Sequence, residues 1–268
     1  MAKINSPLKW WGGKSYLAPK LLQYIPEHIH YVEPYFGGGA LLLAKPYEGI
    51  SEVVNDLNLE LTDFWRCLSN KSEFNEFFRI VQAIPFSQYE YKAASEDAVR
   101  GRVARAVAFF VRCRQSMSGR MDSFAPLSKT RTRRGMNEQA AAWLTAIEGL
   151  SAVHERLKRV VVLCDDALKV IKSQDDPETF FYVDPPYVKS TRTAPKVYRH
   201  EMSLDQHLEL LSILSKIRGK FMLSGYRCSL YDDMASCNGW RRVDFDLPNN
   251  AATGKTKRRM VESIWMNY

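Results

Sequence analysis

Short apolar runs recur along the chain, and most are separated by spacers long enough for helices. These runs, rich in β-branched and aromatic residues, predict strands at residues 31–33, 52–55, 160–164, 179–183, 221–224, 243–247 and 262–266. Strands that alternate with helices are typical of a parallel sheet. The polar loop between the last two runs is too short for a crossover helix. We therefore expect a hairpin there, and a mixed α/β sheet with one antiparallel strand near the C-terminus.

The pattern changes between residues 58 and 159, where the periodicity is helical and strand signals are few. One helix is indicated by apolar residues on a single face, at Val99, Val103, Val107 and Phe110. A second helix is expected from about residue 137 to 156, and the polar stretch 116–135 between them predicts an exposed loop or short hairpin. We therefore expect residues 58–159 to form a mostly helical insertion in a sheet domain made of residues 1–57 and 160–268.

Positive charge is concentrated in one part of this insertion. Ten Lys and Arg residues and a single acid, Asp122, lie between residues 100 and 135. This segment therefore carries +9, and because the whole chain carries +8, the remainder sums to −1. A helix with several arginines is often only a solvated face. A surplus confined to one segment and made mostly of Arg instead favours a phosphate-rich partner.

Composition excludes several other classes of protein. No apolar run approaches the roughly 20 residues that span a bilayer, and the first residues lack the apolar stretch of a signal peptide. The five cysteines are scattered, without a Cys-x-x-Cys pair and without histidines at metal-ligand spacing. We therefore expect no membrane partner, no metal and no disulfide framework, and we expect a reducing cytoplasm.

The tetrapeptide Asp184-Pro185-Pro186-Tyr187 follows the apolar run 180–183. Two prolines cannot continue a strand, so the chain must leave the sheet at its carboxyl edge, where ligands bind in open α/β sheets. A carboxylate, a backbone carbonyl and an aromatic ring there suit a planar ring that carries an amino group. The alternative is a strand-ending turn, with Tyr187 as core packing.

Other polar residues also follow predicted strands. The turn Gly37–Gly39 would let a ligand approach the backbone closely, or serve only tight packing. Asp56 ends the next strand, where it would bind ribose hydroxyls or cap a helix. Of the pair Asp165 and Asp166 we choose Asp166 as a contact for a purine amino group; both could merely cap. The segment 9–14, with two tryptophans and Lys14, would stack on a purine and pair with a carboxylate, or form a structural lid.

The segments Lys9–Lys14, Glu33–Gly39, Val54–Asp56 and Asp184–Tyr187 occur in the order seen in Dam-like adenine-N6 DNA methyltransferases of the alpha arrangement, which the chain resembles. The resemblance implies a Rossmann-like sheet, with residues 58–159 as the target-recognition domain. It implies contacts to S-adenosylmethionine from Trp10, Lys14, Phe36, Gly37, Gly39, Asp56 and Asp184. Asp166 is added as a cofactor contact from its position at the end of a predicted strand. The segment 112–120 departs from the recognition segment of Dam itself, so the Dam target sequence is not carried over.

On this interpretation, Asp184 and the Pro185 carbonyl hold the amino group of a flipped adenine in double-stranded DNA, and Tyr187 stacks on its ring. S-adenosylhomocysteine is then the second product, and no metal is needed. Candidate DNA contacts are Arg112, Arg114, Gln115, Arg120, Arg131, Arg133, Arg134, Lys189, Arg192, Lys257 and Arg258. Of these, Arg114, Gln115 and Arg120 would read base edges in the major groove. The enzyme would either be accompanied by a cognate restriction endonuclease or act without one. Alternatives are a non-catalytic DNA-binding regulator, or an enzyme that methylates cytosine N4, RNA adenine or a protein glutamine.

Overall fold

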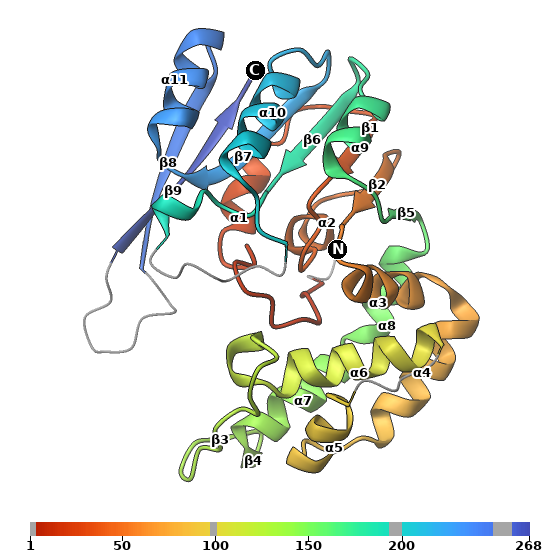
Figure 1. Cartoon of the computed structure of the whole chain (residues 1–268). Coiled ribbons are helices and arrows are strands. Elements are labelled where there is room, and N and C mark those ends of the chain that lie inside the picture. The colour runs from red at the N-terminus through yellow and green to blue at the C-terminus, as the bar shows by residue number, and fades with distance from the viewer. Residues whose placement is uncertain (1–3, 97–100, 193–199, 249–258) are drawn as a thin grey trace. The chain divides into compact units, whose positions relative to one another are not determined.

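The computed structural model describes residues 4–96, 101–192, 200–248 and 259–268 (Figure 1). The chain divides into two compact units. Unit 1 comprises Met1–Tyr24, Gly37–Glu48 and Asn58–Cys164, and unit 2 comprises Ile25–Phe36, Gly49–Leu57 and Asp165–Tyr268. The N-terminal segment and the glycine turn, which we expected in the sheet domain, thus group with the helical stretch. Val99, Lys257 and Arg258 lie outside the described residues.

The main sheet contains all seven predicted strands, in the order β5-β2-β1-β6-β7-β9-β8. Their bounds are β1 His30–Glu33, β2 Ser51–Asn55, β5 Val160–Leu163, β6 Thr179–Val183, β7 Lys220–Tyr226, β8 Arg241–Pro248 and β9 Arg259–Met266. Strand β1 pairs in parallel with β2 and β6, and β6 pairs in parallel with β7. Strand β9 is antiparallel to both β7 and β8, which confirms the expected hairpin and mixed sheet.

Three helices lie on one face of the sheet in unit 2, as Figure 1 shows: α9 Ala167–Ser173, α10 Leu204–Leu214 and α11 Ser229–Asn238. A short 3-10 turn, η3 Lys189–Thr191, follows β6. A capping box marks the start of α10, because the Ser203 hydroxyl accepts from Gln206 N and the Gln206 side chain accepts from Ser203 N. The buried face of α10 begins at His207, whereas Leu204 and Leu208 are exposed.

Unit 1 is mostly helical. Its elements besides β5 are α1 Ala18–Leu21, η1 Leu22–Tyr24, α2 Ala40–Ala44, α3 Leu59–Ser69, α4 Lys71–Ala83, α5 Gln88–Ala93, α6 Arg102–Gln115, η2 Met117–Gly119, β3 Thr132–Arg133, β4 Met136–Asn137, α7 Glu138–Glu148 and α8 Leu150–Leu157. Strands β3 and β4 form the expected short hairpin. The single helix predicted from 137 to 156 is in fact two, interrupted at Gly149.

The core of unit 1 is aromatic. Phe64 of α3 stacks on Phe110 of α6 with ring centroids 5.7 Å apart and an interplanar angle of 6°. Phe77 of α4 meets Phe110 edge-on, and Trp143 of α7 lies 5.2 Å from it. These rings fix α6 among its neighbouring helices. The buried face of α6 is therefore formed by Phe109, Phe110 and Cys113, whereas Val103 and Val107 are only half-buried.

Candidate active site

Asn55, the last residue of β2, ties together three chain segments of unit 2. Its amide nitrogen donates to the carbonyl oxygens of Pro34, at 3.0 Å, and of Asp165, at 2.9 Å. Its amide oxygen accepts from Asp165 N at 2.9 Å. The backbone oxygen of Asn55 accepts from Phe36 N at 2.8 Å. One buried side chain therefore holds the segments after β1 and β2 against the segment that leads into α9.

Asp184 leaves the sheet at the end of β6, whose five residues are all buried. Asp184 itself is half-buried, and Pro185 is buried. Tyr187 is 5% exposed and meets Tyr226, at the end of β7, edge to face with ring centroids 4.7 Å apart. Sequence reasoning missed Tyr226; an aromatic residue soon after an apolar run was the available signal. The end of β6 is therefore followed by a carboxylate, Asp184, and by an aromatic ring, Tyr187, that packs against Tyr226.

The other two predicted acids of this edge differ in what they do. Asp166 caps α9, because its carboxylate accepts from Leu168 N at 2.9 Å and from Lys169 N at 3.1 Å. Asp56 directly follows Asn55 and is half-buried. The cap of α3 is Asn58, whose side chain accepts from Glu60 N and Leu61 N. Capping therefore accounts for Asp166 but not for Asp56.

A buried polar pair lies near the tetrapeptide in unit 2. His207 Nδ1 and the Tyr231 hydroxyl are 3.0 Å apart. Burial raises the pKa of Tyr231 well above its usual range, and the Asp184 carboxylate contributes to the shift. Burial, with the charge of Arg192, lowers the pKa of His207 to about 4. His207 is therefore neutral at physiological pH.

In unit 1 the glycine turn is packed by Trp10. A Cβ atom added at Gly37 would lie 2.8 Å from Trp10 Nε1, and one added at Gly38 would lie 2.8 Å from Trp10 Cβ. Gly37 and Gly39 also have positive φ, +49° and +65°, which favours glycine. The Ser6 hydroxyl donates to Gly38 O at 2.7 Å. Tight packing is thus one reason for the glycines in this turn.

The remaining cofactor candidate of unit 1, Lys14, is 4% exposed, and its ammonium donates to Gly12 O at 2.9 Å. The second tryptophan, Trp11, carries Arg120 over its ring at 4.6 Å from the centroid, a cation–π contact. Trp10 and Trp11 therefore have different partners: Trp10 covers the glycine turn, and Trp11 covers the arginine that follows η2.

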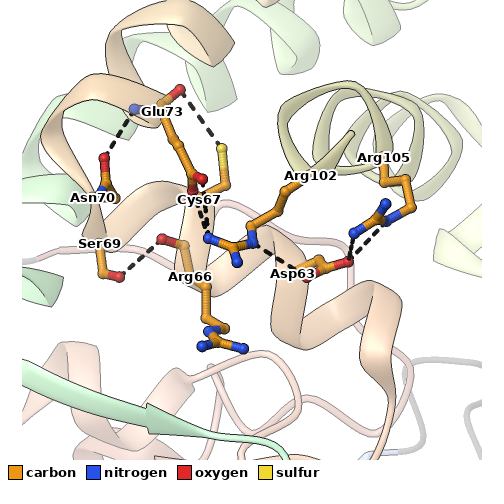
Figure 2. A network of polar contacts seen from close by, with 8 residues as sticks. All are labelled: Asp63, Arg66, Cys67, Ser69, Asn70, Glu73, Arg102 and Arg105. Atoms are coloured by element: carbon orange, nitrogen blue, oxygen red, sulfur yellow. Dashed lines mark hydrogen bonds and ion pairs between the residues drawn. The ribbon is translucent and has the colours of Figure 1, made fainter. Parts of the chain in front are cut away.

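Many arginines of the basic segment are neutralised by acids from elsewhere in unit 1. Figure 2 shows Asp63 of α3 facing both Arg102 and Arg105 of α6. Arg105 Nη2 is 2.7 Å from the Asp63 carboxylate. Arg102 Nη1 donates to Glu73 of α4 at 2.9 Å. The +9 counted along the sequence therefore overstates the charge that this segment offers to a partner.

Four predicted DNA contacts are occupied inside the protein. Gln115 is fully buried and bonds to Ser87 N and Pro85 O, so it is corrected from a base-reading residue to a structural one. Arg112 pairs with Glu60 at 2.8 Å, and Arg114 Nη2 donates to Ala142 O at 2.8 Å. Arg192, with a side chain 6% exposed, pairs with Glu201. These bonds fix α6 and the loop after η3, so Arg112 and Arg192 are not available as surface contacts.

The other described candidates are exposed. Arg133 lies in β3 at the exposed hairpin, and Arg134 follows it with a positive φ of 56°. The Arg134 guanidinium forms two bonds of 2.9 Å to Glu148. Arg131 is 3.9 Å from Glu138, with a side chain 77% exposed, and Arg120 and Lys189 are exposed too. Unit 1 therefore carries a basic hairpin at its surface.

Among the residues that the structure describes, no helix is long and apolar enough to cross a membrane. In the same residues, no group of three or more His, Cys, Asp or Glu side chains is placed to hold a metal ion.

Comparison with known proteins identifies relatives along nearly the whole chain. A type II methyltransferase of Methanocaldococcus jannaschii, M.MjaIII, is 25% identical over 99% of this chain and 100% of its own length. The type II methyltransferase M1.LlaDCHI of Lactococcus lactis subsp. cremoris is 25% identical over 97% of this chain and 94% of its own length. The DNA N-6-adenine-methyltransferase of Escherichia phage P1 is 24% identical over 79% of this chain and 28% of that protein.

A family model matches residues 10–244, a range that includes the tryptophan pair, the glycine turn, Asp56 and the Asp184 tetrapeptide. The chain belongs to the D12 class N6 adenine-specific DNA methyltransferases.

Proposed function

We propose that the chain methylates the N6 atom of an adenine flipped out of double-stranded DNA, with Asp184 and the Pro185 carbonyl as the groups that hold the amine. The observation that carries this proposal is the position of Asp184, half-buried at the end of a fully buried strand and followed at once by two prolines. The prolines fix the backbone, so that the carboxylate and the Pro185 carbonyl are held by the sheet. Two acceptors suit the two N–H groups of an adenine amine.

S-adenosylmethionine would supply a methyl group on a positively charged sulfur, which needs no acid to activate it. The nitrogen of adenine is a weak nucleophile because its lone pair is delocalised into the ring. Two hydrogen bonds accepted by Asp184 and Pro185 favour a pyramidal nitrogen and so localise that lone pair. The groups act by position and charge rather than by forming a covalent bond.

Flipping the base costs a few kcal/mol, which contacts to the extruded ring must offset. Tyr187 was our candidate for stacking, but its ring is largely buried against Tyr226. Tyr226 is the more exposed of the two. We therefore propose that Tyr187 and Tyr226 act together, with Tyr187 fixing the ring of Tyr226 beside the adenine.

For the cofactor we assign Asp56 to the ribose hydroxyls, because it follows the Asn55 clamp and leaves the capping of α3 to Asn58. The backbone nitrogen of Phe36 donates to the backbone oxygen of Asn55, which fixes Phe36 next to the clamp. Asp166 is retained as a second acid whose capping bonds fix its carboxylate. Trp10, Lys14, Gly37 and Gly39 of unit 1 are assigned by their match to the family motifs. No step of the reaction requires a metal.

For DNA we assign the exposed basic residues of the hairpin and its surroundings, together with Lys189 after the tetrapeptide. The hairpin residues are Arg131, Arg133 and Arg134, and Arg120 lies beside Trp11. Phosphate contacts would position the duplex, and arginines at the hairpin would read base edges in the major groove.

Because two relatives are named type II methyltransferases, we also propose a restriction-modification role, with an endonuclease that cuts the same sequence.

The test combines transfer of labelled methyl groups with methylation-sensitive sequencing of DNA from a host that expresses the chain. N6-methyladenine at one short sequence is expected, and that sequence then serves in all later assays. Asp184→Asn should lower kcat roughly a hundredfold to a thousandfold, because it removes the negative charge of the carboxylate that accepts from the reacting amine. Asp205→Asn, at the exposed start of α10, is the matched control and should leave kcat unchanged.

Three outcomes contradict the proposal. Label that appears only on RNA or protein identifies another substrate. DNA binding without N6-methyladenine on any sequence identifies a regulator. An Asp184→Asn protein that methylates as fast as the unchanged chain refutes the role of the carboxylate.

A further inference from the structure

The glycine turn of unit 1 has two successive backbone carbonyls that are bound by side chains of the same unit. The indole of Trp65, in α3, donates from Nε1 to Gly37 O at 3.0 Å. The Ser6 hydroxyl donates to the next carbonyl, Gly38 O, at 2.7 Å. Trp65 is fully buried, and its ring meets the Phe64 ring edge-on with centroids 4.9 Å apart. Two side chains from distant segments of the chain therefore hold neighbouring carbonyls of one turn.

These two bonds also set the direction of two backbone N–H groups. No cis peptide bond occurs among the described residues, and in a trans peptide the C=O and N–H groups point in opposite directions. The Gly37 carbonyl points toward Trp65, so the Gly38 N–H points away from the indole. By the same reasoning, the Gly39 N–H points away from the Ser6 hydroxyl. The turn thus directs its carbonyls toward Trp65 and Ser6, and two N–H groups away from them.

The local sequence does not fix this orientation, because each of the two peptide groups lies between two glycines. Without Cβ atoms on either side, a peptide group can rotate at low steric cost through changes in the two dihedral angles beside it. Gly37 and Gly39 already have positive φ, +49° and +65°. A rotated peptide group would place a carbonyl oxygen where its N–H had been. The side chain that binds each carbonyl therefore decides which group the turn presents on its other side.

We propose that Trp65 and Ser6 are positioning residues that aim the N–H groups of the glycine turn at an acceptor oxygen of the cofactor, an inference that rests on the proposed function. S-adenosylmethionine carries such oxygens on its carboxylate and its ribose. Backbone N–H groups of a turn are suited to bind them, whereas a carbonyl rotated into the same place would repel them. Trp65 acts through the turn and needs no contact with the cofactor itself.

Trp65→Phe tests the proposal, because it keeps a buried aromatic ring and removes only the N–H donor. A typical hydrogen bond shifts an equilibrium by roughly twofold to tenfold, and apparent affinity falls with the fraction of chains whose turn is correctly oriented. The Kd for S-adenosylhomocysteine and the KM for S-adenosylmethionine should therefore rise by roughly threefold to tenfold. The KM for DNA and kcat at saturating cofactor should not change, because Asp184 and Pro185 are untouched.

The experiment is isothermal titration calorimetry of the full chain with S-adenosylhomocysteine, combined with steady-state kinetics and urea unfolding. Trp143→Phe is the matched control. Trp143 of α7 is also buried in unit 1, and its Nε1 donates to Ile84 O at 2.7 Å, away from the glycine turn. This control should lose a similar amount of stability and leave the Kd for S-adenosylhomocysteine unchanged.

Ser6 supplies a second, independent arm of the experiment. Ser6→Ala removes the donor to Gly38 O and should raise the Kd for S-adenosylhomocysteine by roughly twofold to fivefold. Ser6→Thr keeps a hydroxyl and should retain the original Kd. The two Ser6 variants decide the test if Trp65→Phe does not fold.

Three outcomes overturn the inference while the proposed function stands. The first is a Trp65→Phe protein that is less stable but has the original Kd, because its tryptophan is then only structural. The second is an equal rise in Kd for Trp143→Phe, because a general loosening of unit 1 then explains both. The third is a fall in kcat with an unchanged KM for S-adenosylmethionine. An unchanged chain that binds no S-adenosylhomocysteine instead refutes the proposed function, and the inference with it.

Discussion

The clamp formed by Asn55 gives the most direct test of how unit 2 holds its acids. Replacing Asn55 by Ala removes three hydrogen bonds at once, two donated to Pro34 O and Asp165 O and one accepted from Asp165 N. The side chain is 1% exposed, and the bond to Pro34 O is fully buried. Water therefore has limited access to the groups that the substitution leaves behind.

The loss can be estimated from those three bonds. A buried group left without a partner costs about 1–3 kcal/mol, and a bond whose partner still meets water costs about 0.5–1.5 kcal/mol. Taking about 2 kcal/mol for Pro34 O and about 1 kcal/mol for each bond to Asp165, the free energy of unfolding should fall by about 4 kcal/mol. Asn58→Ala is the matched control, because it removes the cap of α3 and should cost about 1 kcal/mol.

The measurement is urea unfolding of the unchanged chain and the two variants, followed by steady-state kinetics in buffer without urea. Because Asp56 follows the clamp, Asn55→Ala should also raise KM for S-adenosylmethionine more than it lowers kcat. An Asn55→Ala protein that loses no more stability than Asn58→Ala refutes the reasoning. A large loss of stability with an unchanged KM would keep the clamp but separate it from cofactor binding.

Two further predictions concern backbone conformation and pH. Gly119→Ala should destabilise the protein by several kcal/mol, because Gly119 has a positive φ of 75° and a Cβ atom added there would lie 1.8 Å from Lys9 O. The control Gly135→Ala, at φ +73° in open space, should cost only about 1–2 kcal/mol. Equal melting temperatures for the two variants would contradict this prediction. The pKa of His207 is lowered to about 4 in the folded protein, so protonation of His207 favours the unfolded chain. The free energy of unfolding should therefore be unaffected by His207 above pH 6.5 and should fall by up to about 3 kcal/mol as the pH drops toward 4. His207→Gln should flatten the curve of unfolding free energy between pH 6.5 and pH 4, and parallel curves for the two proteins would refute the assignment.

The strands and their chemistry could be predicted because their signals are local. An apolar run followed by two prolines must end at Asp184 whatever surrounds it, and all seven predicted strands are present. The capping box at Ser203 is likewise a contact between residues three apart. Local sequence patterns do not predict which residues of a helix are buried. The apolar residues of α10 include exposed Leu204 and Leu208, and its buried face instead contains His207.

Charge was the least predictable property of this chain. Counting residues gives +9 for the segment 100–135. In the structure, however, the arginines of α6 are paired with acids that precede them by 29 to 52 residues: Arg102 with Glu73, Arg105 with Asp63 and Arg112 with Glu60. Only the packing of α3 and α4 against α6 brings these acids to the arginines. Gln115 is corrected for the same reason, since its partners Ser87 and Pro85 are 28 and 30 residues away.

The sequence by itself determined the α/β class, the order of the motifs and the identity of the acid at the end of β6, because strand periodicity, proline and motif spacing act over a few residues. Only the tertiary structure decided which polar side chains remain for a ligand. It assigned Asn55 to a clamp, Asp166 and Asn58 to caps, and three arginines of α6 to internal acids. The physical reason is that a charge or amide is satisfied by whatever lies within about 3 Å of it, and that neighbour is fixed by packing between residues far apart in the sequence.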